Sequence, residues 1–311
     1  MRTDPADRRG FLRGAALAAG ALALPGPRLH AAGSRLHLSC NEYVWLVYYQ
    51  REGRNLPALL DTALGEVALA GFDGFEPSVE SPAQLESLGA LARRHGLELR
   101  SLYVNSTLHE PGLVDRSIAD VLALARAALS LGTRIIVTNP SPIRWGGPEN
   151  KSDRQLECQA QALSRLGREL SGLGLRLAYH NHDVELRQAA REFHHMLAAT
   201  DPQHVHLCLD AHWVYRGSGD SQVALFDVVR LYGARIVELH VRQSQGGTWT
   251  EALGDGDVDY ARLAQTLAEA RLTPHVVLEQ AIETGSPSTM GVVEAQRRSV
   301  AYARKVLAPL A

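Results

Sequence analysis

The chain of 311 residues has few of the residues that several common kinds of site require. Its three cysteines, Cys40, Cys158 and Cys208, are too few for a disulfide framework, and we interpret them as small buried apolar residues. Its only lysines are Lys151, at the start of a predicted helix, and Lys305, in the last one. A Schiff-base enzyme needs a lysine amine in its site, so a lysine-dependent aldolase is excluded. No G-x-S-x-G motif occurs, which argues against a serine nucleophile.

Charge and hydropathy exclude two further classes of protein. The net charge of −2 and the pI near 6.7 argue against a general attraction to nucleic-acid phosphates or to anionic lipid. The apolar run over residues 15–24 is too short for a bilayer, which takes about 20 residues. We therefore expect no nucleic-acid partner and no stable membrane anchor.

The first 33 residues have the layout of a twin-arginine export signal. Residues 8–13 read RRGFLR, a weakly apolar run follows over 15–24, and small residues end the segment at 31–33. The alternative is a disordered amino terminus rich in Arg and Ala. We predict a signal over 1–33, export to the periplasm, and a folded domain over 34–311.

Strand and helix patterns alternate through the rest of the chain. Eight alternations predict a (β/α)8 TIM barrel. A doubly wound open sheet is the second choice, but its Gly-rich turn is missing after the first strand, at residues 39–42. The apolar runs of strand length are 36–40, 72–76, 97–104, 134–138, 175–180, 205–210, 235–241 and 275–279. The helical patterns are 56–70, 82–95, 115–131, 152–173, 188–200, 221–232, 257–271 and 288–308.

Four of the predicted strands end in a residue that can bind a metal. His180 and Asp210 are 30 residues apart, as are Asp210 and His240, and Glu279 follows 39 residues later. Parallel strands bring their carboxyl ends to one edge, so these side chains should converge. Two imidazoles and two carboxylates suit one divalent ion, with Mn expected first and Zn, Co, Fe or Mg as alternatives. His182 shares a strand face with His180, so either could be the ligand there. The other interpretation is a purely structural polar cluster.

These residues resemble those of the xylose isomerase-like barrel superfamily, and especially its sugar phosphate isomerase/epimerase group. That group includes ketose 3-epimerases, hydroxypyruvate isomerase and inosose dehydratase. Its metal ligands come from strands 5 to 8 in the order Glu, Asp, His, Glu. The last three match Asp210, His240 and Glu279, whereas His180 stands at the first position. Arg242 resembles a family residue that contacts substrate oxygens.

The histidine on the fifth strand changes the expected chemistry. In the epimerases of this group two metal-bound glutamates serve opposite faces of the substrate, but here Glu279 alone remains as a carboxylate base. His182 or His212 could supply the second proton-transfer group. Such a site suits isomerisation or elimination at least as well as epimerisation, with the metal as Lewis acid.

Further residues at the strand ends are candidates for binding a sugar. We predict that Glu76, Asn139 and Trp213 contact the substrate together with Arg242; Glu76 could instead hydrogen-bond a ligand imidazole. Trp213 is one of four tryptophans in predicted strand-to-helix turns, which either cover the rim or stack on a sugar. These tryptophans are Trp45, Trp145, Trp213 and Trp249.

The sequence thus predicts an exported, metal-dependent isomerase or epimerase of an unphosphorylated sugar or keto-sugar. Sugar phosphates are mainly cytoplasmic, and no phosphate loop is visible. The alternatives are a lyase or dehydratase acting on a keto-sugar, keto-glycoside or inosose, and a non-catalytic carbohydrate-binding barrel. DNA repair is disfavoured by the charge and the export signal. Whether the chain forms a homo-oligomer stays open.

Overall fold

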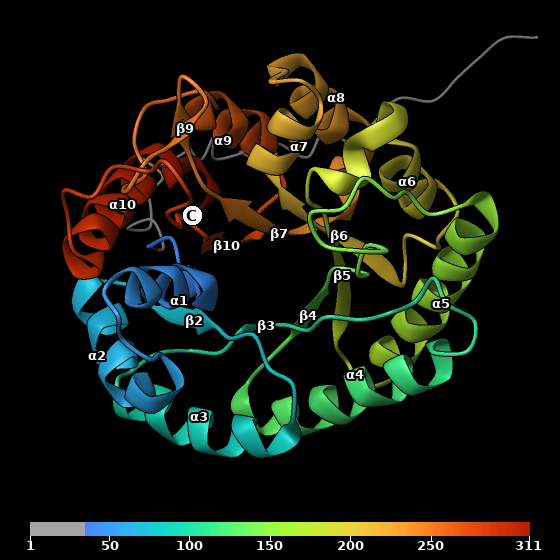
Figure 1. The fold of residues 1–311 in the computed structure, drawn as a ribbon, viewed down its shortest axis with the longest axis horizontal. Helices are drawn as coiled ribbons and strands as arrows, with labels where there is room; N and C mark the ends of the chain where they lie inside the picture. The colour runs from blue at the N-terminus through green and yellow to red at the C-terminus, as the bar shows by residue number, and fades with distance from the viewer. Residues whose placement is uncertain (1–34) are drawn as a thin grey trace, which may run out of the picture. The chain divides into compact units, whose positions relative to one another are not determined.

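The computed structural model describes residues 35–311, and the export signal predicted over 1–33 lies outside the described residues. Eight parallel strands curl into a near-closed barrel with helices around it (Figure 1), so the predicted TIM barrel is confirmed. The barrel strands are β1 Leu38–Asn41, β2 Gly74–Glu76, β3 Ser101–Tyr103, β4 Ile135–Thr138, β5 Arg176–His180, β6 Val205–Asp210, β7 Ile236–Val241 and β10 His275–Leu278. The α-helices are α1 Glu42–Arg51, α2 Leu60–Ala70, α3 Pro82–Arg94, α4 Val114–Ala128, α5 Asp153–Gly172, α6 Arg187–Ala198, α7 Ala211–Gly217, α8 Gln222–Tyr232, α9 Tyr260–Glu269 and α10 Val292–Val306.

Local signals in the sequence set the ends of these helices. Ser152 caps α5, because its hydroxyl accepts the Gln155 amide and the Gln155 side chain accepts the Ser152 amide. Gly174 follows the same helix at a φ of +76°, a conformation that glycine adopts without strain, and the chain turns there into β5.

The strand order places the predicted metal ligands on neighbouring strands. Going round the barrel it is β2, β1, β10, β7, β6, β5, β4, β3, and all pairings are parallel. The ring closes through isolated bridges from Gly74 to Glu98 and from Ser78 to Tyr103. Asp210 pairs directly with His240 across β6 and β7. The carboxyl ends of β5, β6, β7 and β10 therefore form one contiguous arc.

Three elements were not predicted from the sequence. One is α1, which begins directly after β1 where a turn was expected. Asn41 caps it by accepting the Tyr43 amide at 2.8 Å. Trp45 lies on this helix with no exposed surface and donates to Glu66 at 3.1 Å. The prediction that Trp45 lies in a turn was wrong, and its burial leaves it no face for a sugar.

The other two lie on either side of β7. The first is α7, and the second is a hairpin of β8 Ser244–Gln245 and β9 Thr248–Trp249. Gly246 and Gly247 form its turn, both at positive φ, and the Asp257 carboxylate accepts both of their amides at 2.8 Å. The hairpin thereby holds Trp249 at a fixed place above the barrel.

The space between the strands and the helices is apolar, as the strand patterns require, whereas the buried residues of the barrel strands also include polar and charged side chains. Cys40 and Cys208 are buried in β1 and β6, Cys158 is half-buried in α5, and all three are free. The prediction of buried cysteines is confirmed for Cys40 and Cys208 but not for Cys158, which is partly exposed on α5. Over residues 35–311 no helix has both the length and the hydropathy to cross a membrane.

Lys151 is a buried cation that ties the loop before α5 to α6. Its Nζ lies 2.6 Å from Glu192 Oε1 and donates to the Pro140 carbonyl at 3.1 Å. Lys151→Met should leave the Glu192 carboxylate without a cationic partner, with the Gln159 amide still donating to it, and should lower the free energy of unfolding by about 3–5 kcal/mol. The expected readout is a lower urea midpoint with an unchanged m-value, whereas the matched change at exposed Lys305, Lys305→Met, should have little effect. Equal midpoints for the two variants would contradict this role.

Candidate metal centre

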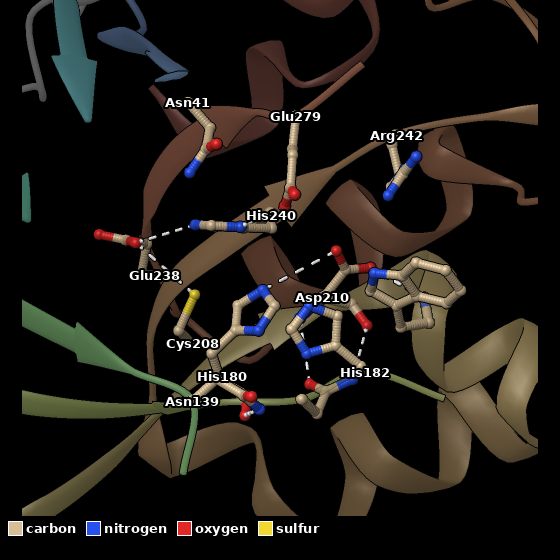
Figure 2. A network of polar contacts seen from close by, with 12 residues as sticks. Asn41, Asn139, His180, His182, Cys208, Asp210, Glu238, His240, Arg242 and Glu279 are labelled. Atoms are coloured by element: carbon tan, nitrogen blue, oxygen red, sulfur yellow. Dashed lines mark hydrogen bonds and ion pairs between the residues drawn. The ribbon is translucent and has the colours of Figure 1, made fainter. Parts of the chain in front are cut away.

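The four predicted ligands meet at the carboxyl end of the barrel (Figure 2). His180 ends β5, Asp210 ends β6, His240 lies in β7, and Glu279 follows β10. One donor atom from each lies within 4.8 Å of all the others. The first three have no exposed surface and Glu279 is 7% exposed. The spacing in the sequence therefore did predict which side chains converge.

Unpaired polar atoms in this cluster fit a bound cation. Neither ring nitrogen of His180 has a hydrogen-bond partner, and the same holds for Asp210 Oδ2. His180 Nε2 and Asp210 Oδ2 are 3.9 Å apart, which is too long for a hydrogen bond. Leaving such atoms unpaired in a protein interior is costly, and a divalent ion between them would satisfy both. The other Asp210 oxygen accepts the Trp213 amide at 2.8 Å and fixes the carboxylate.

Contacts on both sides of its ring orient His240. Nδ1 lies 2.9 Å from Glu279 Oε2, on the side of the cluster. Nε2 lies 3.1 Å from Glu76 Oε1 and 3.2 Å from Glu238 Oε1. An Nε2–H that donates to these carboxyls leaves Nδ1 for a metal, the arrangement that usually supports a ligand imidazole.

The pKa values of the cluster are shifted by burial and by mutual charge. Burial would lower the pKa of His240, but the charge of adjacent Glu76 and the hydrogen bond to Glu238 outweigh it and raise the pKa well above its usual range. Burial would raise the pKa of Glu279, but the hydrogen bond and charge of His240 lower it. Burial, and next the Glu279 charge, raise the pKa of Asp210 to about 7. Glu279 therefore carries a negative charge at neutral pH.

A deeper layer of buried groups lies under His240. Glu76 accepts Asn41 Nδ2 and the Ser101 hydroxyl, each at 2.7 Å. Burial would raise the pKa of Glu76, but the charge of His240 lowers it to about 2. Burial and the Glu76 charge raise the pKa of Glu238 to about 8, so at neutral pH this pair of carboxyls holds one proton. Glu76 thus contacts the imidazole of His240, a predicted ligand, and it is buried and does not line the cavity.

Two other groups of donors in this layer fit a metal less well. Cys208 lies near His180 and His240, but burial raises the pKa of its thiol well above its usual range, so it keeps its proton. Glu76, Glu238 and His240 are also close together, yet Glu76 already accepts two hydrogen bonds there. The four residues at the strand ends are the better ligand set.

The Asn139 side chain stabilises the end of β5 by hydrogen bonds. Its Nδ2 donates to the His180 carbonyl and to Glu185 Oε1, both at 3.1 Å. Glu185 Oε2 in turn accepts the His182 amide at 2.7 Å. The Asn139 and Glu185 side chains are fully buried, so Asn139 lies behind His180 and not on the cavity wall, where a substrate contact was predicted.

The sequence did not point to Glu185 or Glu238. The alternation of β7 would have found Glu238, because it lies two residues before His240 and faces the same side of the strand. Glu185 had no such signal, since it stands in a short 3-10 helix, Val184–Leu186, after the strand. Burial raises its pKa to about 7, with the Glu192 charge as the next cause.

A cavity of about 580 Å³ opens at this end of the barrel. His182 and Glu279 line it, whereas His180 belongs to the cluster beneath. The structure thereby separates the two histidines between which the sequence left the choice. Burial lowers the pKa of His182 to about 4, so its imidazole is neutral at pH 7. The other lining residues are Asn41, Glu42, Tyr43, Leu46, Ser78, Tyr103, Asn105, Trp145, Asp183, Trp213, Arg242, Trp249 and Glu283.

Arg242 lies in the cavity wall between two indole rings. Its guanidinium carbon is 3.8 Å from the centroid of Trp249 and 5.1 Å from that of Trp213. One amine donates to Glu283 at 2.9 Å, while Nε has no partner. Arg242 and Trp213 are thus placed where a substrate could reach them. Trp145 is 55% exposed and packs edge-on against His182, at the rim of the cavity.

His212 is not among the residues that line the cavity. Its Nε2 lies 2.8 Å from the Ser244 hydroxyl, and its ring packs against Trp249 with centroids 4.2 Å apart and the ring planes tilted by 40°. Burial, and next the Arg242 charge, lower its pKa to about 3. Of the two histidines predicted to transfer protons, only His182 faces the cavity, and His212 supports the β8–β9 hairpin.

Comparison with known proteins agrees with this geometry. Residues 64–305 match the family described as xylose isomerase-like TIM barrel. An inosose dehydratase of Clostridium botulinum (strain Alaska E43 / Type E3) is 23% identical over 249 residues, which cover 70% of this chain and 81% of that protein. A sugar phosphate isomerase/epimerase from Parabacteroides distasonis ATCC 8503 has a similar fold, with a TM-score of 0.69 at 17% identity over 90% of this chain and 96% of its own.

A D-psicose 3-epimerase crystallised in the presence of D-fructose is similar at a TM-score of 0.67 and 16% identity, over 88% of this chain and 99% of its own. At these identities the solved structures establish the fold alone. The family match covers most of the chain and includes all four strand ends of the cluster. The chain therefore belongs to the xylose isomerase-like TIM barrel family.

Proposed function

We propose that this chain is a divalent-metal-dependent enzyme that removes the proton next to a carbonyl of an unphosphorylated sugar or keto-sugar, with isomerisation or epimerisation as the outcome. Its main support is the position of Glu279, whose carboxylate belongs to the buried cluster and also lines the cavity. A general base must lie within hydrogen-bond reach of the proton that it removes, and this carboxylate is also next to the groups that would hold the activating metal. Manganese is the ion we expect first.

The residues of the cluster and of the cavity have different roles in the proposed reaction. A divalent ion held by His180, Asp210, His240 and Glu279 would supply Lewis acidity to a carbonyl. Glu279 is ionised and can accept the proton from the neighbouring carbon. His182, neutral and on the β5 side, can exchange a second proton. Arg242 can donate to substrate oxygens through the nitrogen that lacks a partner.

The charge of the cavity favours a substrate without phosphate. Its lining contains the carboxyl groups of Glu42, Asp183, Glu279 and Glu283 and only one guanidinium, that of Arg242. Arg242 is already paired with Glu283. A phosphate dianion would meet this excess of negative charge, whereas sugar hydroxyls can hydrogen-bond to carboxylates and stack on the indoles.

A lyase or dehydratase is the second candidate. It is favoured by His180, which stands where the epimerases of the group have a second glutamate, and by the similarity to proteins named inosose dehydratase. With Glu279 as the carboxylate base, loss of a group β to the carbonyl needs no second carboxylate on the opposite face. A non-catalytic sugar-binding barrel is the candidate of another class.

One experiment separates the three. The manganese-loaded chain is incubated in deuterated water with ketoses, keto-glycosides and inososes, and the products are followed by NMR. We expect deuterium at the carbon next to the carbonyl, and EDTA should stop its incorporation. A new epimer or isomer supports the first candidate, and an unsaturated or ring-opened product supports the second. Sugar binding that depends on metal but gives no exchange would contradict both enzymes.

We further propose that the chain is exported to the periplasm by the twin-arginine route, on the strength of the RRGFLR segment at residues 8–13. Changing Arg8 and Arg9 together to Lys should block export, because the pathway reads the arginine pair. Cell fractionation should then find the variant uncleaved in the cytoplasm. Normal processing of the variant would contradict this route.

A further inference from the structure

The opposite end of the barrel holds a second cavity of about 450 Å³, at the amino ends of the strands. Four arginines and two histidines stand around an apolar base that includes Ile135 and Val237. The charged and polar lining residues are Arg35, His37, Arg100, Arg134, Arg176 and His275, with Thr273 beside them. TIM barrels place their chemistry at the other end, so a site here would bind without catalysing.

Three of the arginines are held in a row by the sheet. The Arg134 amide donates to the Arg100 carbonyl at 2.9 Å, and the Arg176 amide donates to the Arg134 carbonyl at 3.0 Å. They therefore occupy matching positions where β3, β4 and β5 begin, on strands spaced about 4.8 Å apart. Like charges side by side on neighbouring strands destabilise a sheet. An anion between them would offset that repulsion.

Carboxylates of the chain neutralise only part of this charge. Glu98 pairs with Arg100 at 2.6 Å, and Asp73 pairs with Arg35 and with Arg304 on α10. Within residues 35–311, neither Arg134 nor Arg176 forms an ion pair, and both are exposed to the solvent of the cavity. Two guanidinium groups thus remain for a ligand.

Unpaired imidazole nitrogens lie deeper in the same cavity. The rings of His37 and His275 are 5.3 Å apart, and both nitrogens of His37 and Nε2 of His275 are buried without a hydrogen-bond partner. His37 Nε2 approaches Glu98 Oε2 only to 3.5 Å, a long contact. The cavity therefore combines positive charge at its rim with unused hydrogen-bonding atoms below.

We propose that this cavity binds a phosphate group, with Arg134 and Arg176 as its principal ligands. A guanidinium is a planar fork of N–H donors, and several forks around one depression suit a group with three or more oxygens and more than one negative charge. A single carboxylate suits this cavity less well than a phosphate, because it supplies only two oxygens and one negative charge. The phosphate could belong to a small soluble molecule or to a lipid headgroup, since both present the same chemistry.

The test uses the full, metal-loaded chain at constant ionic strength. Inorganic phosphate is titrated by calorimetry, and co-sedimentation is measured with phosphatidylglycerol vesicles against phosphatidylcholine vesicles. Arg134→Gln/Arg176→Gln removes the two unpaired guanidiniums. The control Arg154→Gln/Arg168→Gln removes the same charge from two exposed arginines of α5. All four side chains are exposed, so folding should be kept.

We expect the Arg134/Arg176 variant to bind at least ten times more weakly than the control, which should match the wild type. Loss of phosphate binding in the calorimeter would indicate a soluble phosphate, and loss of vesicle binding alone would indicate a headgroup. Equal binding by the two variants would overturn the proposal, as would no binding of either probe by the wild type.

Discussion

Asp210→Ala should remove the bound divalent ion, and His240→Ala should do the same. Asp210 supplies an unpaired carboxylate oxygen and His240 a ring nitrogen to the buried cluster. Because even residues that only support a ligand change metal affinity about 10- to 100-fold, loss of a ligand itself should cost roughly 100-fold or more. The measurement is metal content by mass spectrometry after gel filtration, together with calorimetric titration of Mn²⁺ into the apo chain.

Asp183→Ala provides the matched control for this experiment. Asp183 lines the same cavity but is absent from the cluster. Its variant should keep the wild-type metal content, whatever happens to turnover. Full metal occupancy in both Asp210→Ala and His240→Ala, equal to that of Asp183→Ala, would contradict this ligand set. The metal would then have to lie elsewhere in the chain.

Glu279→Gln should abolish exchange of the substrate's α-hydrogen with deuterated water. The amide keeps the size of the side chain but cannot accept the proton. Loss of a positioned base typically slows the reaction 10²- to 10⁴-fold, which corresponds to about 3–5 kcal/mol of activation free energy. The exchange rate is measured by NMR at saturating Mn²⁺, and the metal content of the same samples is determined alongside it.

The Glu283→Gln variant is the control that distinguishes loss of the proposed base, Glu279, from loss of one negative charge in the cavity wall. Glu283 lines the cavity and pairs with Arg242, but it is not part of the cluster. We expect this variant to alter substrate affinity more than the exchange rate at saturation. Near-normal exchange by Glu279→Gln with the metal still bound would contradict the single-carboxylate mechanism and shift the role of base to His182.

Much of this fold could be predicted because a parallel barrel buries both faces of its strands. Such strands read as short continuous apolar runs, and the 30-residue spacing between them reflects one strand and one helix. The runs that end in His180, Asp210 and His240 show this plainly. By contrast, α1 carries aromatic and β-branched residues directly after a strand, and its helical conformation depends on the cap from Asn41 and on packing of Trp45 under α2.

The convergence of the four clustered side chains was predictable because each stands at or next to the end of its own strand. The supporting residues were not, since their roles depend on neighbours from other strands. Glu76 and Glu238 reach the His240 ring from β2 and from β7 itself. Asn139 reaches the His180 carbonyl from the loop after β4. His212 follows β6, but its ring contacts Ser244 in the β8–β9 hairpin, which was not predicted.

Anomalous X-ray diffraction from manganese-soaked crystals would locate the bound ion directly. We expect one peak at the carboxyl end of the barrel, about 2 Å from a donor atom of each of His180, Asp210, His240 and Glu279. A peak held by His182 in place of His180, a peak among Glu76, Glu238 and His240, or no peak at this end of the barrel would contradict this expectation.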